Sequence, residues 1–342
     1  MIMNLKNYFF IFIAVTCLLP GFARADFSEG NLFILNQPSS RSAGPDFILE
    51  FSPEGDYLNT LISTTLNIQG MRDLAFDPVS GHLFYTVNHW GDQIFEIREI
   101  DENGTLLNTY ISSEFGSGNI ELVFDQEGNL LIANDGFIYK KEAGSSDIIQ
   151  LFELPYTGIG DLEQDSHGNL YLTDPFINDV VYKITPDGTA TIFADSDDGI
   201  DNPYGLAMDK DNNLYVGNNI PSGPATIVKL DPFGTPTPFA GGISFQPGIL
   251  DMVFDANGVL YASCRSDHEI LKFDAGGNRV IFADNDDNIS DPASMAFIIY
   301  PLSCPADFDE DGDIDGSDLA EFAANFIEDC LEAFAGMFGQ TN

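Results

Sequence analysis

The sequence has little positive charge. Its 342 residues include 13 Lys and Arg against 54 Asp and Glu, a formal net charge of −41. Two of the basic residues, Lys6 and Arg24, lie in the first 25 positions, which leaves 11 in the rest of the chain. So acidic a surface repels the phosphates of nucleic acids and the headgroups of anionic membranes. We therefore expect no nucleic-acid partner.

Cysteine and histidine are also scarce, with four of each, and Trp90 is the single tryptophan. No histidine lies in a nucleophile motif, and no Ser-His-Asp or Cys-His arrangement stands out, which argues against a hydrolase of those classes. Beyond Cys17, an odd number of cysteines remains, so one stays unpaired in an exported protein. We predict a buried thiol at Cys264, and Cys304 and Cys330 bracket a short acidic segment that a disulfide could close.

Long apolar runs are absent after residue 25. Within residues 1–25, Lys6 precedes the apolar stretch Tyr8–Leu19, and Ala23-Arg24-Ala25 offers a cleavage site between small residues. This is the pattern of a signal peptide, and the apolar stretch is too short for a confident membrane-spanning helix. We expect a secreted, extracellular protein that begins near Asp26 and has no membrane span.

What the sequence does have is a repeated phrase, clearest at residues 162–194. Four short apolar runs, Leu162 onward, 169–173, 180–184 and 189–194, are separated by turns rich in Gly, Asp and Pro. This alternation predicts four antiparallel strands joined by hairpins. The first run recurs at Leu74, Leu122, Leu206 and Met252 and, truncated, at Met295. Repeats of about 40–50 residues with four strands each are typical of a β-propeller.

The two ends of the repeat region complete each other. Residues 30–35 match the second strand of a repeat at residues 168–173, and residues 294–299 supply a first strand with nothing after it. We therefore predict an all-β fold over residues 26–301, a six-bladed propeller closed by pairing of residues 31–35 with 296–299. An Asp begins the turn after each complete first strand, at Asp77, Asp125, Asp165, Asp209 and Asp255. We interpret these carboxylates as closing the turns rather than binding metal.

Pro203-Tyr-Gly-Leu-Ala-Met-Asp209, followed by Asn213-Leu-Tyr-Val216, resembles the NHL repeat. Residues 30–300 also resemble the six-bladed gluconolactonase and strictosidine-synthase-like propellers. The lactonase resemblance implies a catalytic divalent metal held at the central channel by Glu, Asn and Asp. The aligned positions here are Arg72, Gly160, Tyr204 and Leu250, and the Glu-Gly-Pro entry of that family is missing. Metal-dependent hydrolysis of a lactone or ester, or a lyase reaction, is therefore the alternative function.

Carboxylates precede four of the first strands, at Asp73, Glu121, Asp161 and Asp251, where the other two have Gly205 and Ser294. We expect them near the mouth of the central channel, where they would repel one another unless a cation lay among them. They are one residue away from the lactonase positions, and a strand residue displaced by one is expected to face the other way.

Unusual side chains occur in the loops that propellers use for ligands. Asn88, His89, Trp90 and His268 are candidates for contact with a carbohydrate or peptide, since an exposed Trp stacks on flat apolar surfaces. The alternative is a Trp packed between blades. Two acidic links between blades, residues 193–203 and 282–292, match each other closely. Calcium binding and shared repeat ancestry explain that match equally well.

Residues 302–342 form a separate segment in which 11 acidic residues and no Lys or Arg follow Cys304. Gly312 and Ile314 occupy positions six and eight of an EF-hand loop, and the alternative is an acidic linker. Six acidic residues supply the predicted calcium ligands: Asp307, Asp309, Asp311, Asp313, Asp315 and Asp318.

An apolar stripe, Leu319, Phe322, Ala323 and Phe326, then predicts a helix. Residues 304–327 resemble a dockerin repeat, which implies calcium as cofactor and a cohesin-like or cell-surface partner bound through residues 304–342. The second calcium loop usual in dockerins is absent. We predict a secreted binding or scaffold propeller that this module tethers to an extracellular assembly, with a link to polysaccharide breakdown.

Overall fold

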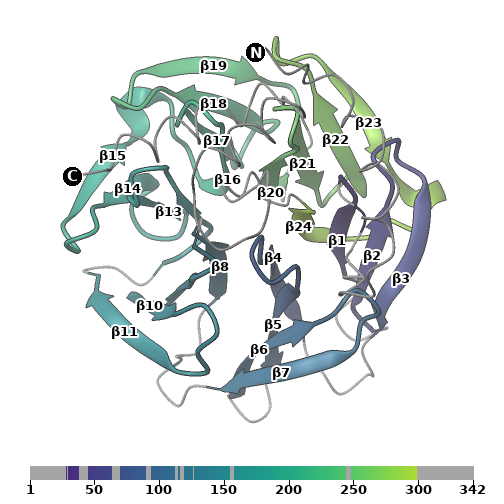
Figure 1. Cartoon of the computed structure of the whole chain (residues 1–342). Helices are drawn as coiled ribbons and strands as arrows, with labels where there is room; N and C mark the ends of the chain where they lie inside the picture. Colours follow the sequence, from purple (N-terminus) through teal and green to yellow (C-terminus); the bar gives the residue numbers. More distant parts are fainter. Residues whose placement is uncertain are drawn as a thin grey trace, which may run out of the picture.

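The computed structural model describes residues 28, 30–37, 45–63, 70–89, 94–111, 115, 119–125, 127–154, 158–243 and 248–298. These residues form six four-stranded antiparallel sheets arranged as the blades of a ring (Figure 1). The fold is therefore the all-β, six-bladed propeller that the repeats predict. Each blade is named below by its inner strand, the one nearest the central channel.

From the inner to the outer strand, the blades are as follows. The β24 blade has β24 (Pro292–Phe297), β1 (Leu32–Asn36), β2 (Phe47–Phe51) and β3 (Tyr57–Ser63). The β4 blade has β4 (Met71–Phe76), β5 (Leu83–His89), β6 (Ile94–Ile100) and β7 (Leu106–Ile111). The β8 blade has β8 (Ile120–Phe124), β9 (Leu130–Asn134), β10 (Phe137–Lys141) and β11 (Ile148–Glu153). The β12 blade has β12 (Leu162–Gln164), β13 (Leu170–Asp174), β14 (Val180–Ile184) and β15 (Ala190–Ala194). The β16 blade has β16 (Pro203–Met208), β17 (Leu214–Asn218), β18 (Thr226–Leu230) and β19 (Pro236–Ala240). The β20 blade has β20 (Ile249–Phe254), β21 (Leu260–Cys264), β22 (Glu269–Phe273) and β23 (Arg279–Ala283).

The ring is closed by strands from opposite ends of the described chain, as predicted. β24 pairs antiparallel with β1, with Phe297 opposite Leu32 and Ala296 opposite Phe33. This pairing gives the incomplete first and last repeats a full sheet of four strands. It also covers the edge of β1 that would otherwise be open to association with another chain.

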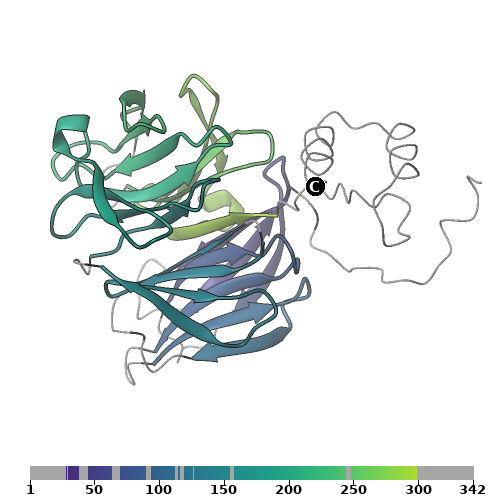
Figure 2. The same cartoon turned by 60° about the vertical axis from the view of Figure 1, so that its left-hand side comes forward.

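The core lies between the blades, which pack face to face around the ring (Figures 1 and 2). Phe33 and Leu35 of the β24 blade, for example, lie in one cluster with Met71 and Tyr85 of the β4 blade. Because each sheet has a neighbour on both sides, five of the six second strands are buried along their whole length, and β5 is buried up to His89. The outer strands β3 and β7 are largely exposed. Cys264 ends one such second strand and is a buried thiol, as expected.

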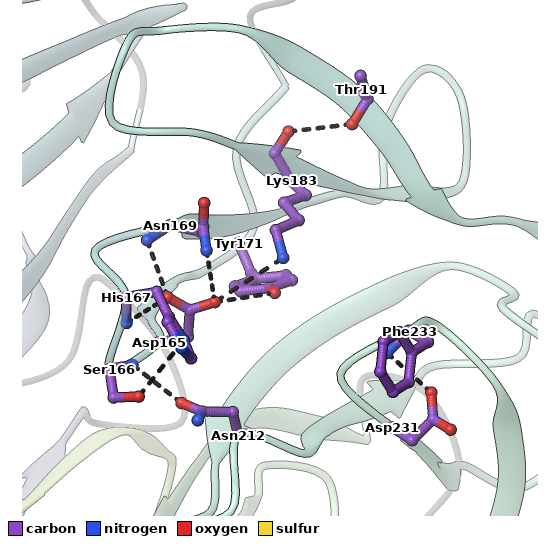
Figure 3. A network of polar contacts seen from close by, with 10 residues as sticks. All are labelled: Asp165, Ser166, His167, Asn169, Tyr171, Lys183, Thr191, Asn212, Asp231 and Phe233. Atoms are coloured by element: carbon purple, nitrogen blue, oxygen red, sulfur yellow. Dashed lines mark hydrogen bonds and ion pairs between the residues drawn. The ribbon is translucent and has the colours of Figure 1, made fainter.

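The turns after the inner strands are closed by their aspartates, which confirms their structural interpretation. Figure 3 shows Asp165, whose carboxylate accepts hydrogen bonds from the backbone N–H groups of His167 and Asn169, each at 2.9 Å. Lys183 extends over the Tyr171 ring toward the same carboxylate, with Nζ 3.8 Å from Oδ2. Asp209 is bonded in the same way by Asn213 and Lys229. These aspartates therefore stabilise their turns.

The two matched acidic links form the same structure, a short 3-10 helix: η2 (Ser196–Asp198) and η3 (Asn285–Asp287). In each, the side chain of the preceding aspartate, Asp195 or Asp284, accepts a bond from the backbone two residues later. The aspartate that ends each helix, Asp198 or Asp287, accepts a hydrogen bond in return from the backbone N–H of Asp195 or Asp284. The link carboxylates therefore cap their own turns, which accounts for the matching sequences without calcium.

Several predictions concern residues outside the described ranges: the signal peptide at residues 1–25, Trp90, the Cys304–Cys330 disulfide and the calcium loop at residues 307–318. Within the described ranges, no helix has the length and apolar character needed to cross a membrane.

Candidate functional site

A cavity of about 520 Å³ opens at one end of the central channel. Its acidic lining consists of Asp73, Glu121, Asp161 and Asp251, the carboxylates that precede the inner strands. Arg72, Arg265 and the aromatic pair Phe176 and Tyr204 add positive charge and an apolar surface. The amide side chains in the lining are Gln37, Asn119, Asn202 and Asn219. The volume is in the range of small-molecule sites.

Irregular pairing at the start of the inner strands determines which side chains reach this cavity. In β4 the register shifts between Met71 and Leu74, which pair with Val87 and Tyr85 of β5. Three steps on β4 therefore face two on β5, which is a β-bulge. The same shift occurs between Pro203 and Leu206 and between Ile249 and Met252.

The bulges overturn one sequence expectation. The acidic residues lie one position away from the lactonase-aligned residues, and their side chains were therefore expected to face the opposite way. Both members of a neighbouring pair line the cavity instead: Arg72 with Asp73, and Leu250 with Asp251. A bulge breaks the alternation of side chains, so that consecutive residues can face the same space. In each bulge, a side-chain hydroxyl accepts the hydrogen bond of the backbone N–H of the acidic residue. Asp73 N–H donates to Thr86 Oγ1, and Asp251 N–H donates to Ser263 Oγ.

Three of the four carboxylates fasten one blade to the next. Asp73, Asp161 and Asp251 occur on alternate blades, and each accepts a hydrogen bond from a backbone N–H of the following inner strand. These bonds join Asp73 to Leu122, Asp161 to Leu206 and Asp251 to Met295, each at 2.6 Å. We call these three aspartates the inter-blade latches. A serine does the same between β24 and β4, where Ser294 Oγ accepts from Leu74 N–H at 3.1 Å.

The other two inner strands differ. Glu121 lies in β8, which pairs with β9 without a bulge. Its side chain is 8% exposed, and its carboxylate accepts no hydrogen bond from the described residues. Gly205 replaces the acid in β16, because a Cβ there would lie 2.9 Å from the Asp251 Cα. Glu121 is therefore the cavity carboxylate without a structural partner.

Burial and crowding raise the pKa values of these acids. Burial raises the pKa of Asp73 to about 6, although bonds from Ser294, Leu122 and Leu74 oppose the rise. Burial, followed by the charges of Asp73 and Asp161, raises the pKa of Glu121 well above its usual value. Burial likewise raises the pKa of Glu163, two residues along β12 from Asp161, to about 8. Asp161 and Asp251 shift in the same direction, again mainly through burial.

The metal set of the lactonase resemblance does not fit these residues. At its aligned positions, Arg72, Gly160 and Leu250 offer no carboxylate or amide oxygen from a side chain, and the nearby aspartates already bond backbone N–H groups. Among the described residues, no group of three His, Cys, Asp or Glu is arranged to hold a metal ion. We derive no metal-dependent step at this site.

The described loop candidates, Asn88, His89 and His268, are not among the residues that line the cavity. The Asn88 backbone N–H donates to Gly70 O at 3.1 Å, and its side-chain oxygen is buried without a partner. His89 Nε2 lies 3.4 Å from Glu96 Oε1. His268 has a φ of 58°, and its backbone N–H donates to Arg265 O. The structure thus brings the four acidic candidates together but not these three.

Sequence reasoning missed the aromatic pair. Phe176 lies in the turn between β13 and β14, and Tyr204 lies in the β16 bulge of the next blade. Their ring centroids are 5.7 Å apart at an interplanar angle of 84°, an edge-to-face contact. Only the position of Tyr204 among the lactonase-aligned residues gave any signal, because the contact joins two blades.

No protein-family model matches the chain, and no curated protein sequence does. Solved structures do resemble it. A chain of a nidogen–laminin complex superposes with a TM-score of 0.62 at 16% identity, over 80% of this chain and 99% of that one. A streptogramin B lyase gives 0.54 at 16% identity, over 79% and 93%. Virginiamycin B lyase from Staphylococcus aureus gives 0.52 at 16% identity, over 73% and 87%. At these identities the likeness shows the fold, a six-bladed propeller shared by proteins of different function.

Proposed function

We propose that this chain is a secreted binding protein whose propeller takes a small polar ligand, such as a sugar or a peptide segment, at the channel mouth. The observation that carries the proposal is the cavity of about 520 Å³, in which an aromatic pair and an unpartnered carboxylate share one space. Apolar surface with a few directed polar groups is the usual composition of a ligand site. The latch aspartates hold the surrounding strands in place.

The ligand site can be tested by ligand-observed NMR with a library of sugars, short peptides and fragments. We expect binders whose signals weaken by about tenfold or more in Tyr204→Leu, because a stacked ring contributes roughly 1–3 kcal/mol. Tyr57→Leu, on exposed β3, is the matched control and should bind normally. Binding that Tyr204→Leu leaves intact would place the ligand elsewhere.

The C-terminal segment supplies the second half of the proposal. The spacing of Asp307, Asp309, Asp311 and Asp318 favours a calcium loop, and its dockerin-like character favours a protein partner outside the cell. Calorimetric titration of the full chain with calcium should show binding, since six aspartates in twelve residues repel one another without a cation. Asp309→Asn with Asp311→Asn should abolish it. Unchanged heat in that variant would assign the calcium to another part of the chain.

A second candidate function has a specific observation in its favour. Burial raises the pKa of Glu121 well above its usual value, and a carboxyl that holds its proton more firmly is suited to protonate a leaving group. That would make the chain a hydrolase acting on lactones or esters, or a lyase. Turnover in a screen of lactones and esters, with and without calcium, that is lost in Glu121→Gln would favour this candidate over binding alone.

A further inference from the structure

We infer that the ligand of the channel mouth is an organic cation, held by the Glu121 carboxylate and packed against the rings of Phe176 and Tyr204. The inference rests on the proposed function, because it names the chemical class of the ligand for the same cavity. It is carried by three observations: a buried acid without a partner, an excess of carboxyl groups, and an aromatic wall.

Glu121 is the cavity carboxylate that accepts no hydrogen bond from the part of the chain that the structure describes, although the charge of Arg72 acts on it. It is 8% exposed, it lines the cavity, and it accepts no hydrogen bond from the described residues. Burying a carboxylate without a partner costs several kcal/mol, so such groups acquire a proton or a cation. The latch aspartates differ because backbone N–H groups already bond to them. A ligand ammonium would supply Glu121 with what the fold does not.

The charge balance of the cavity points the same way. Arg265 forms a two-bond ion pair with Asp291, at 2.5 and 2.8 Å, so its charge is already matched. Arg72 is the other guanidinium in the lining, and its charge opposes the rise in the pKa of Glu121. Two guanidinium groups therefore share the lining with four carboxyl groups, those of Asp73, Glu121, Asp161 and Asp251. An anionic ligand would meet this excess of carboxyl groups, whereas a cation would relieve their repulsion.

The aromatic wall distinguishes an organic cation from a bare metal ion. Phe176 is 58% exposed although it is a large apolar side chain, and it meets Tyr204 edge to face. Burial alone raises the pKa of Tyr204, whose hydroxyl has no hydrogen-bond partner among the described residues. Ring faces beside a carboxylate attract ammonium groups through the ring quadrupole. A metal ion would gain nothing from these rings.

Benzylamine and benzyl alcohol are suitable probes, since they share a ring and differ in charge. By calorimetry at pH 7.5, we expect benzylamine to bind at least tenfold more tightly than benzyl alcohol. Glu121→Gln should remove that difference, and Glu153→Gln, on exposed β11, should keep it. Benzylamine affinity should also rise with pH as Glu121 loses its proton among Asp73, Asp161, Asp251 and Arg72.

The outcomes separate the two proposals. Equal binding of both probes, lost in Tyr204→Leu, would overturn the cationic ligand and leave the binding site at the channel mouth standing. Calcium chloride provides a second test. If calcium binds in a way that depends on Glu121 and does not displace benzylamine, Glu121 holds a metal ion and the cationic ligand is overturned. Benzylamine binding that keeps its full advantage over benzyl alcohol in Glu121→Gln would overturn the role of Glu121 and place the probe elsewhere on the acidic surface.

Discussion

Raising the pH from 5 to 9 is expected to destabilise the propeller, and Glu163→Gln is expected to remove a large part of that loss. Burial raises the pKa of Glu163 from 4.5 to about 8 in the folded chain. The folded state therefore binds this proton more tightly than the unfolded state does. Its contribution to stability is full below pH 4.5 and is lost as the pH rises through 8.

The expected size of the effect is about 3–5 kcal/mol at pH 9, because each tenfold tightening of proton binding in the folded state is worth about 1.4 kcal/mol. Urea unfolding of the two proteins across this range measures it. Glu163→Gln should be the more stable protein at pH 9, with a shallower dependence on pH. Asp73, with a pKa of about 6, adds a second loss at lower pH that the variant keeps. Glu153→Gln is the control, because that side chain is exposed. A wild-type stability that stays level or rises from pH 5 to 9 would refute the proposed burial of Glu163.

Asp161→Ala is expected to lower the free energy of unfolding by about 2–4 kcal/mol, because it leaves two backbone N–H groups without an acceptor. Its carboxylate accepts from Leu162 N–H at 2.7 Å and from Leu206 N–H at 2.6 Å, and the second bond joins the β12 and β16 blades. The amide of Leu206 should also exchange its hydrogen faster in the variant.

Glu121→Gln is the matched control for the latch. It removes a carboxylate from the same cavity that accepts no bond from the described residues. Its free energy of unfolding should change little at low pH and should increase at high pH, where repulsion with the aspartates is removed. If Asp161→Ala costs no more than Glu121→Gln in urea unfolding, the inter-blade latches do not stabilise the ring.

The sequence was sufficient for the ring because the propeller repeats one phrase. The recurrences at Leu74, Leu122, Leu162, Leu206 and Met252 mark five inner strands, and residues 31–35 and 296–299 mark the closing pair. Hairpin strands are local features, set by alternation and turn residues, and such features can be predicted from a single sequence. The turn aspartates follow from the same local chemistry.

The candidate site was harder to predict, because its geometry depends on contacts between strands and between blades. The bulges at Asp73 and Asp251 arise from pairing with β5 and β21, so they cannot be predicted from the residues of β4 or β20 alone. The contact of Phe176 with Tyr204 likewise joins two blades. Asn88 and His89 were predicted from their residue types in a loop, and the structure does not place them in the cavity lining.

The central claim is that ligands bind at the channel mouth. A crystallographic fragment screen of the full chain tests it most directly, because it reports the position of every bound fragment. We predict that fragments gather against Glu121, Phe176 and Tyr204, with cationic ones most frequent. Fragments that instead gather beside Asn88 and His89 or along the outer strands, and leave this cavity free, would contradict the account.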